Sequence, residues 1–110
     1  MSKKVLIIIS TAEKEKALTA IVYAKNAIKN NWLDDIKVVL FGPIEKLLAE
    51  DDDLRSKFDS LLKYQKPVAC KFVSDQDNVS DSLSEMGYEV EYVGKLISDY
   101  IGDGYVPMVY

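Results

Sequence analysis

The feature that most constrains the fold is the uninterrupted apolar run Val5–Ile9, which begins a repeated pattern of short apolar runs and amphipathic stretches. An apolar, mostly β-branched run without polar alternation indicates a strand that is buried on both faces, as in the centre of a parallel sheet. Apolar residues then recur at spacings of three and four, including Ala17, Ile21 and Ala24, and this pattern predicts a helix over residues 12–30. A strand followed by a helix of this length is typical of a βαβ unit.

The same alternation continues along the chain. Further strands are predicted at Ile36–Phe41, Pro67–Phe72, Glu89–Val93 and Tyr105–Tyr110. Further helices are predicted over 43–49 and 53–64, from Ser74-Asp75 or Asn78–Ser80 to Gly87, and over 95–101. This order predicts an α/β fold, namely a single-domain three-layer sandwich over residues 1–110 with a mostly parallel five-stranded sheet and helices on both faces. The last strand should lie at an edge, because Pro107 cannot donate a ladder hydrogen bond.

Composition narrows the class of function. The 110 residues carry a net charge of −4, and the lysines are scattered among acids, so we expect no nucleic-acid partner. Val5–Ile9 is too short to span a bilayer or to form a signal-peptide core, so we expect no membrane partner and a cytoplasmic protein. A single cysteine fits a reducing compartment. Without histidine, the available ligands form a poor set for zinc, and we predict no metal site.

Nucleotide-binding motifs are also missing from the sequence. Neither Gly-x-Gly-x-x-Gly nor Gly-x-x-x-x-Gly-Lys-[Ser/Thr] occurs, which excludes the dinucleotide fingerprint and the P-loop. The residues after the first strand lack the hydroxyl-rich loop of a flavodoxin and the acidic pair of a receiver domain. We therefore predict no cofactor.

A site, if present, should lie at the carboxyl ends of the strands, where open α/β sheets bind their ligands. Three loops meet this condition: Ser10–Ala12, Phe41–Pro43 and Cys70–Ser74. The ligand-binding residues predicted for this strand-end cleft are Ser10, Thr11, Gly42, Pro43 and Lys71. Three of them have a simpler alternative: Ser10 and Thr11 as helix caps, and Lys71 as a surface lysine on a strand, facing away from its neighbour Cys70.

Cys70 is the candidate for covalent chemistry, because a thiol is the one strong nucleophile in this chain. Helix N-termini at the strand ends, together with Lys71, would favour its thiolate form. The alternative is structural, since cysteine is among the residues most often buried as a small hydrophobe. The acidic run Glu50–Asp53 similarly suggests a metal site, but such runs are more typical of a capped, solvated helix start.

Several segments in order resemble the DsrE/DsrF-like proteins. They are the opening 3–11 followed by a long helix, Val38–Pro43, Val68–Lys71, Gly87–Gly94 and Gly104–Tyr110. The resemblance covers nearly the whole chain. It implies a small α/β protein that forms homo-oligomers, trimers or hexamers, with relatives that relay sulfur.

In the sulfur-relay members, a cysteine after the third strand accepts a persulfide and passes the sulfane sulfur to the next carrier. Cys70 matches that cysteine through its place after Val68-Ala69 and eight residues before Asn78. Many archaeal-type relatives carry a second cysteine three residues further on, where this chain has Val73, so relay would run between proteins.

The resemblance therefore implies a sulfur carrier of the sulfurtransferase type. Its partners would be sulfur donor and acceptor proteins or small sulfane-sulfur compounds. The competing hypothesis is a non-catalytic oligomeric binding or assembly subunit in which Cys70 is structural. The carrier requires an accessible thiol, whereas the subunit requires only that Cys70 fill the core.

Overall fold

The apolar runs form one sheet whose neighbouring strands are all parallel. The computed structural model describes residues 3–110. Within them the strands are β1 (Lys4–Ile9), β2 (Asp35–Leu40), β3 (Val68–Cys70), β4 (Glu89–Glu91) and β5 (Val106–Val109). Their spatial order is β4-β3-β2-β1-β5, which confirms the five-stranded sheet and the edge position of the last strand.

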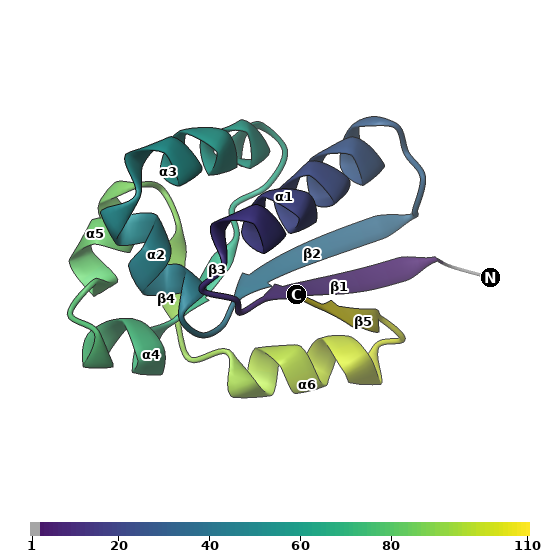
Figure 1. The fold of residues 1–110 in the computed structure, drawn as a ribbon. Coiled ribbons are helices and arrows are strands. Elements are labelled where there is room, and N and C mark those ends of the chain that lie inside the picture. Colours follow the sequence, from purple (N-terminus) through teal and green to yellow (C-terminus); the bar gives the residue numbers. More distant parts are fainter. Residues whose placement is uncertain (1–2) are drawn as a thin grey trace.

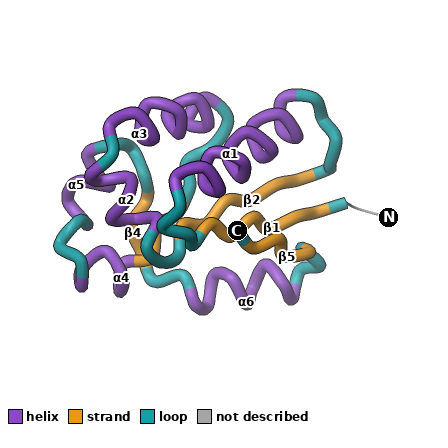
Figure 2. Tube along the Cα trace, viewed as in Figure 1, coloured by secondary structure: helices purple, strands orange, loops and turns teal. Residues whose placement is uncertain are grey.

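Helices cover both faces of this sheet, so the three-layer α/β sandwich is confirmed. They are α1 (Lys14–Lys29), α2 (Ile44–Glu50), α3 (Asp52–Phe58) continued by the 3₁₀ helix η1 (Asp59–Lys63), α4 (Lys71–Gln76), α5 (Ser80–Glu85) and α6 (Gly94–Gly102). Figure 1 shows α1 and α3 on one face of the sheet and α6 on the other. The short helices α2, α4 and α5 gather beside the carboxyl ends of the strands, as the tube in Figure 2 also shows.

The alternation of side chains along β1 explains why its sequence is apolar throughout. Val5, Ile7 and Ile9 pack into the larger core under α1, α2 and α3, whereas Leu6 and Ile8 pack into a smaller cluster on the α6 side. Successive residues of a strand point to opposite faces. A central strand covered on both faces therefore needs no polar position.

The third strand is shorter than predicted. β3 ends at Cys70, and α4 begins at Lys71, so the prediction of a strand through Phe72 is wrong. The ladder partner of Ala69 is Leu40, the last residue of β2, and the partner of Cys70 is Glu91, the last residue of β4. Beyond Cys70 neither neighbouring strand offers a partner, and a helix satisfies the backbone groups instead.

The start of α1 also differs from the prediction. α1 begins at Lys14, because the amides of Ser10 and Thr11 both donate to the carbonyl of Tyr110, at 2.8 and 3.2 Å, and this keeps the loop extended. The acidic run does start a helix, as expected. Asp51 caps α3 by accepting a hydrogen bond from the Leu54 amide at 2.9 Å.

No helix within residues 3–110 is long and apolar enough to cross a membrane.

Candidate functional site

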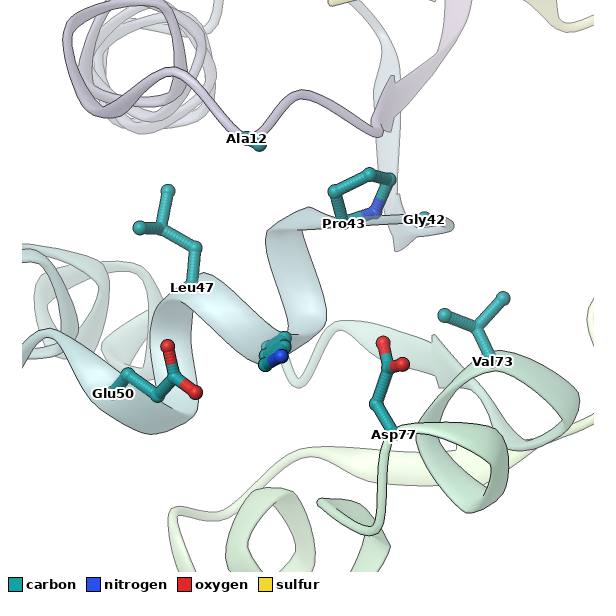
Figure 3. A pocket seen from close by; sticks show the side chains of 8 residues that line it. Ala12, Gly42, Pro43, Leu47, Glu50, Val73 and Asp77 are labelled. Carbon is teal, nitrogen blue, oxygen red and sulfur yellow. The ribbon is translucent and has the colours of Figure 1, made fainter.

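A pocket of about 580 Å³ lies beyond the carboxyl ends of β1, β2 and β3, at the edge of the sheet where the sequence predicts a site. Figure 3 shows it between the loop after β1, helix α2 and helix α4. Its walls are formed by Ala12, Gly42, Pro43, Lys46, Leu47, Glu50, Val73 and Asp77. All three predicted loop regions therefore contribute to one pocket, and most of its surface is apolar.

The turn after β2 has a backbone that requires glycine. Gly42 has a φ of +136°, and a Cβ at this position would lie 2.4 Å from Ser10 Oγ and 3.1 Å from the Ser10 carbonyl oxygen. The Ile44 amide donates to that same carbonyl at 3.1 Å. Glycine thus lets the turn that starts α2 lie directly against the end of β1, which places both loops in the pocket wall.

Helix α2 supplies one wall of the pocket. Pro43, Lys46, Leu47 and Glu50 are spaced by three and four residues, so they share one side of the helix. In Figure 3 the Leu47 side chain points toward the loop that carries Ala12. Lys46 is exposed and forms no ion pair with any described residue, so its ammonium group is free to meet a ligand.

The opposite wall comes from α4 and the turn that follows it. Val73 and the Asp77 carboxylate point toward the Gly42–Pro43 turn and α2 in Figure 3. The fully buried Ser74 fixes this segment, because its hydroxyl lies 2.6 Å from Ser80 Oγ and donates to the Lys71 carbonyl at 3.2 Å. Partly buried hydrogen bonds therefore hold the α4–α5 turn that carries Asp77.

One carboxyl group is buried behind this pocket. Glu45 is completely inaccessible to solvent, although it follows the exposed turn at Pro43 by two residues. Its Oε2 accepts a hydrogen bond from the Gly42 amide at 3.3 Å, and its Oε1 has no hydrogen-bond partner among residues 3–110. Burial raises the pKa of Glu45 to about 8; the Gly42 hydrogen bond opposes this shift, and the negative charge of Asp77 adds to it.

Cys70 lies outside the pocket. Only 4% of its surface is exposed, and it packs with Leu6, Ile8, Val39 and Val93 on the α6 side of the sheet. Its position as the last residue of β3 points its side chain to the same face as Val68, away from the core that α2 covers. The thiol therefore has the surroundings of a small core residue.

The other predicted site residues have different positions. Gly42 and Pro43 line the pocket, whereas Ser10 supports it from behind through Gly42. Thr11 uses its hydroxyl to accept a hydrogen bond from the Glu13 amide at 3.0 Å. Lys71 lies in the first turn of α4 and not on a strand, and its ammonium group is 2.7 Å from Asp75 Oδ2, a contact that raises the pKa of Lys71.

Sequence reasoning missed the pocket residues that come from helices. Lys46, Leu47 and Glu50 follow Pro43 at helical spacing, and this was the available signal for a shared wall. Nothing in the sequence marked Asp77 or Glu45, because their positions depend on how α4 and α2 pack together. Within the described part of the chain, no group of three or more potential ligands is arranged to hold a metal ion.

Comparisons with known proteins add information about the fold. No family model matches the sequence, and no curated protein is significantly similar to it. A solved structure of a conserved protein of unknown function from Bacteroides thetaiotaomicron superimposes with a TM-score of 0.91 and 23% sequence identity, covering 98% of this chain and 95% of that one. The similarity shows that the two chains share the fold throughout their length.

Proposed function

We propose that this protein is a non-catalytic binding protein that holds a small organic ligand in the pocket between α2, α4 and the loop after β1. The observation that supports this most directly is the position of the pocket, at the carboxyl ends of three parallel strands. Its volume of about 580 Å³ falls within the range of about 300–1,000 Å³ that is usual for small-molecule sites. The burial of Cys70 supports the structural role that this proposal gives to the thiol.

The wall residues indicate the chemistry of the ligand. Pro43, Leu47 and Val73 offer apolar surface for an aliphatic or aromatic body. Lys46 contributes a positive charge, and Glu50 and Asp77 contribute negative charges. An amphipathic molecule with polar substituents at two ends would satisfy this combination, since a few placed polar groups orient a ligand on an apolar wall.

The test is a fragment screen that uses the methyl resonances of Leu47 and Val73 as reporters. Small aromatic and aliphatic compounds with amine or carboxylate substituents are added to the labelled protein. We expect some to shift these two methyl groups and to lose binding in Leu47→Arg, which fills the pocket with a charge. Val22→Arg is the matched control, because Val22 is 52% exposed on α1 and does not line this pocket. Val73 methyl shifts that survive in Leu47→Arg, or no shifts from any compound in the wild type, would reject this pocket as the site.

Sulfur relay through Cys70 is the second candidate. Two observations favour it: the resemblance to the DsrE/DsrF-like proteins, and the location of Cys70 at the end of β3, one residue before α4. A thiolate on Cys70 would attack a donor persulfide, hold the terminal sulfur and release it to an acceptor thiolate. With 4% of its surface exposed, Cys70 would need a local opening of the α6 side before it could react.

Intact mass distinguishes the two candidates. The native protein and Cys70→Ser are exposed to a sulfane-sulfur donor and weighed before and after a reductant. If the protein is a binding protein with a structural Cys70, we expect no gain in mass and slow alkylation of native Cys70. A sulfur atom gained by the wild type alone, and removed by the reductant, would establish the carrier.

Homo-oligomer formation is a further part of the proposal. Val106 and Val109 on the edge strand β5 are 62% and 67% exposed, which supports a subunit contact there. Light scattering of the purified protein tests it: a mass of one chain at micromolar concentration would contradict the trimer or hexamer that the resemblance implies.

A further inference from the structure

The buried carboxyl of Glu45 lies behind the residues that form the pocket. Its Oε2 accepts a hydrogen bond from the amide of Gly42, which lines the pocket. The negative charge of Asp77, which lines the opposite wall, also raises the pKa of Glu45. Its own position is completely inaccessible. The junction between α2 and the α4–α5 segment therefore contains a titratable group that the proposed ligand contacts do not use.

We propose that Glu45 is a proton-dependent latch for this pocket: as the neutral acid it holds the first turn of α2 in place, and as the carboxylate it releases that turn and rearranges the pocket wall.

The cost of ionising Glu45 in place is the physical basis of the latch. A carboxylate at zero exposure needs several hydrogen bonds, but Glu45 receives one from Gly42, and its Oε1 has no partner within residues 3–110. Asp77 adds repulsion instead of compensation. Movement of the ionised side chain toward water would lower this cost.

The groups on the neighbouring helices do not supply the missing cation. α3, α4 and α5 are the helices that pack against α2. Arg55 of α3 and Glu85 of α5 line a separate pocket together with Asp59, whereas Lys71 of α4 is paired with Asp75. On α2 itself, Lys46 and Glu50 face the ligand pocket. The charged neighbour that affects the pKa of Glu45 is therefore Asp77, whose negative charge raises it.

The structure also shows which segment would move. α2 has seven residues and follows β2 through the Phe41–Pro43 turn, in which Gly42 has a φ of +136°. The same turn and the outer face of α2 form one wall of the pocket. A shift of the first turn of α2 would therefore change the shape of the pocket while leaving the sheet intact.

The experiment is an NMR titration of the full chain from pH 6 to 9.5, without any ligand, so its outcome does not depend on the proposed function. The Gly42 amide reports ionisation of Glu45, and the methyl groups of Leu47 and Val73 report the pocket wall. We expect all three to shift together with a midpoint near pH 8. The Gly104 amide, in the turn beside Lys4 at the amino end of β1, should not follow this midpoint.

Two variants give the controls. Glu45→Gln should abolish the shared titration, and Asp77→Asn should move its midpoint to lower pH by removing the neighbouring negative charge. The second variant keeps the test decisive if the first fails to fold. A Gly42 shift without movement of the Leu47 and Val73 methyl groups would overturn the latch, and so would the absence of any shared midpoint between pH 6 and 9.5.

Discussion

Replacing Glu45 by glutamine should change how the stability of the protein depends on pH. The pKa of Glu45 is raised from 4.5 to about 8 in the folded state by burial, so between these values the folded chain holds a proton that the unfolded chain has lost. The contribution of Glu45 to the free energy of unfolding is therefore at its maximum below pH 4.5. It declines by about 1.4 kcal/mol per pH unit as the pH rises toward 8.

The chain is well suited to this measurement because it contains no histidine, the side chain whose ordinary pKa lies in the same window. The carboxyls of Asp51, Asp53 and Asp75 have lowered pKa values, so their stabilising effects are lost only under more acidic conditions. Between pH 5 and 7.5 the wild type should lose about 3 kcal/mol relative to Glu45→Gln.

Urea denaturation followed by circular dichroism at pH 5.0, 6.0, 7.0 and 7.5 gives the two profiles, with the dependence on urea concentration used to confirm two-state unfolding. Burial of the glutamine amide can add a difference between the two proteins, but that difference does not vary with pH. Parallel profiles, separated by a constant amount across the range, would refute the reasoning.

Three further substitutions test the packing of the Gly42 turn and of the core. Gly42→Ala should lower the free energy of unfolding by at least about 2 kcal/mol, because φ is positive at this position and the added Cβ would meet Ser10. Gly102→Ala is the control and should cost nothing, because the space around Gly102 is open among the described residues. Equal effects of the two substitutions in thermal unfolding would contradict this prediction. Tyr88→Phe should be neutral or stabilising by up to about 1 kcal/mol, because the buried hydroxyl has no partner within residues 3–110. If chemical denaturation shows instead that the variant is destabilised by more than about 1 kcal/mol, the hydroxyl has a partner and the reasoning is wrong. Cys70→Ser should destabilise the protein by about 1–3 kcal/mol, because it buries a hydroxyl without a hydrogen-bond partner. If the thiol is a core residue, Cys70→Ser should be less stable than Cys70→Ala in chemical denaturation, and the opposite ranking would contradict this.

Much of the fold follows from local sequence patterns. The run at Val5–Ile9, the helical spacing from Ala17 onward and the proline at position 107 each predict their element, and the structure confirms all three. These predictions succeed because strand and helix periods are properties of the chain itself, and a period of two or of 3.6 is visible without knowing the neighbours.

The end of β3 shows where such reasoning stops. Val68–Phe72 is apolar enough to continue as a strand, but β2 and β4 end opposite Ala69 and Cys70, so the chain turns into α4. Strand length is thus set by partners distant in sequence. The prediction that Lys71 lies on a strand is wrong for this reason.

The candidate site divides in the same way. Local patterns were enough to predict that the loops after the strands meet at one edge of a parallel sheet, because strand direction and connection handedness leave little choice. They marked Gly42 and Pro43 through their turn chemistry, and Cys70 through the reactivity of a thiol. Tertiary packing, in contrast, places Cys70 under α6 and makes Asp77 face α2 across a pocket. It also decided that Glu45 is completely buried, since burial and the electrostatics that follow from it depend on which helices pack together and not on the local pattern.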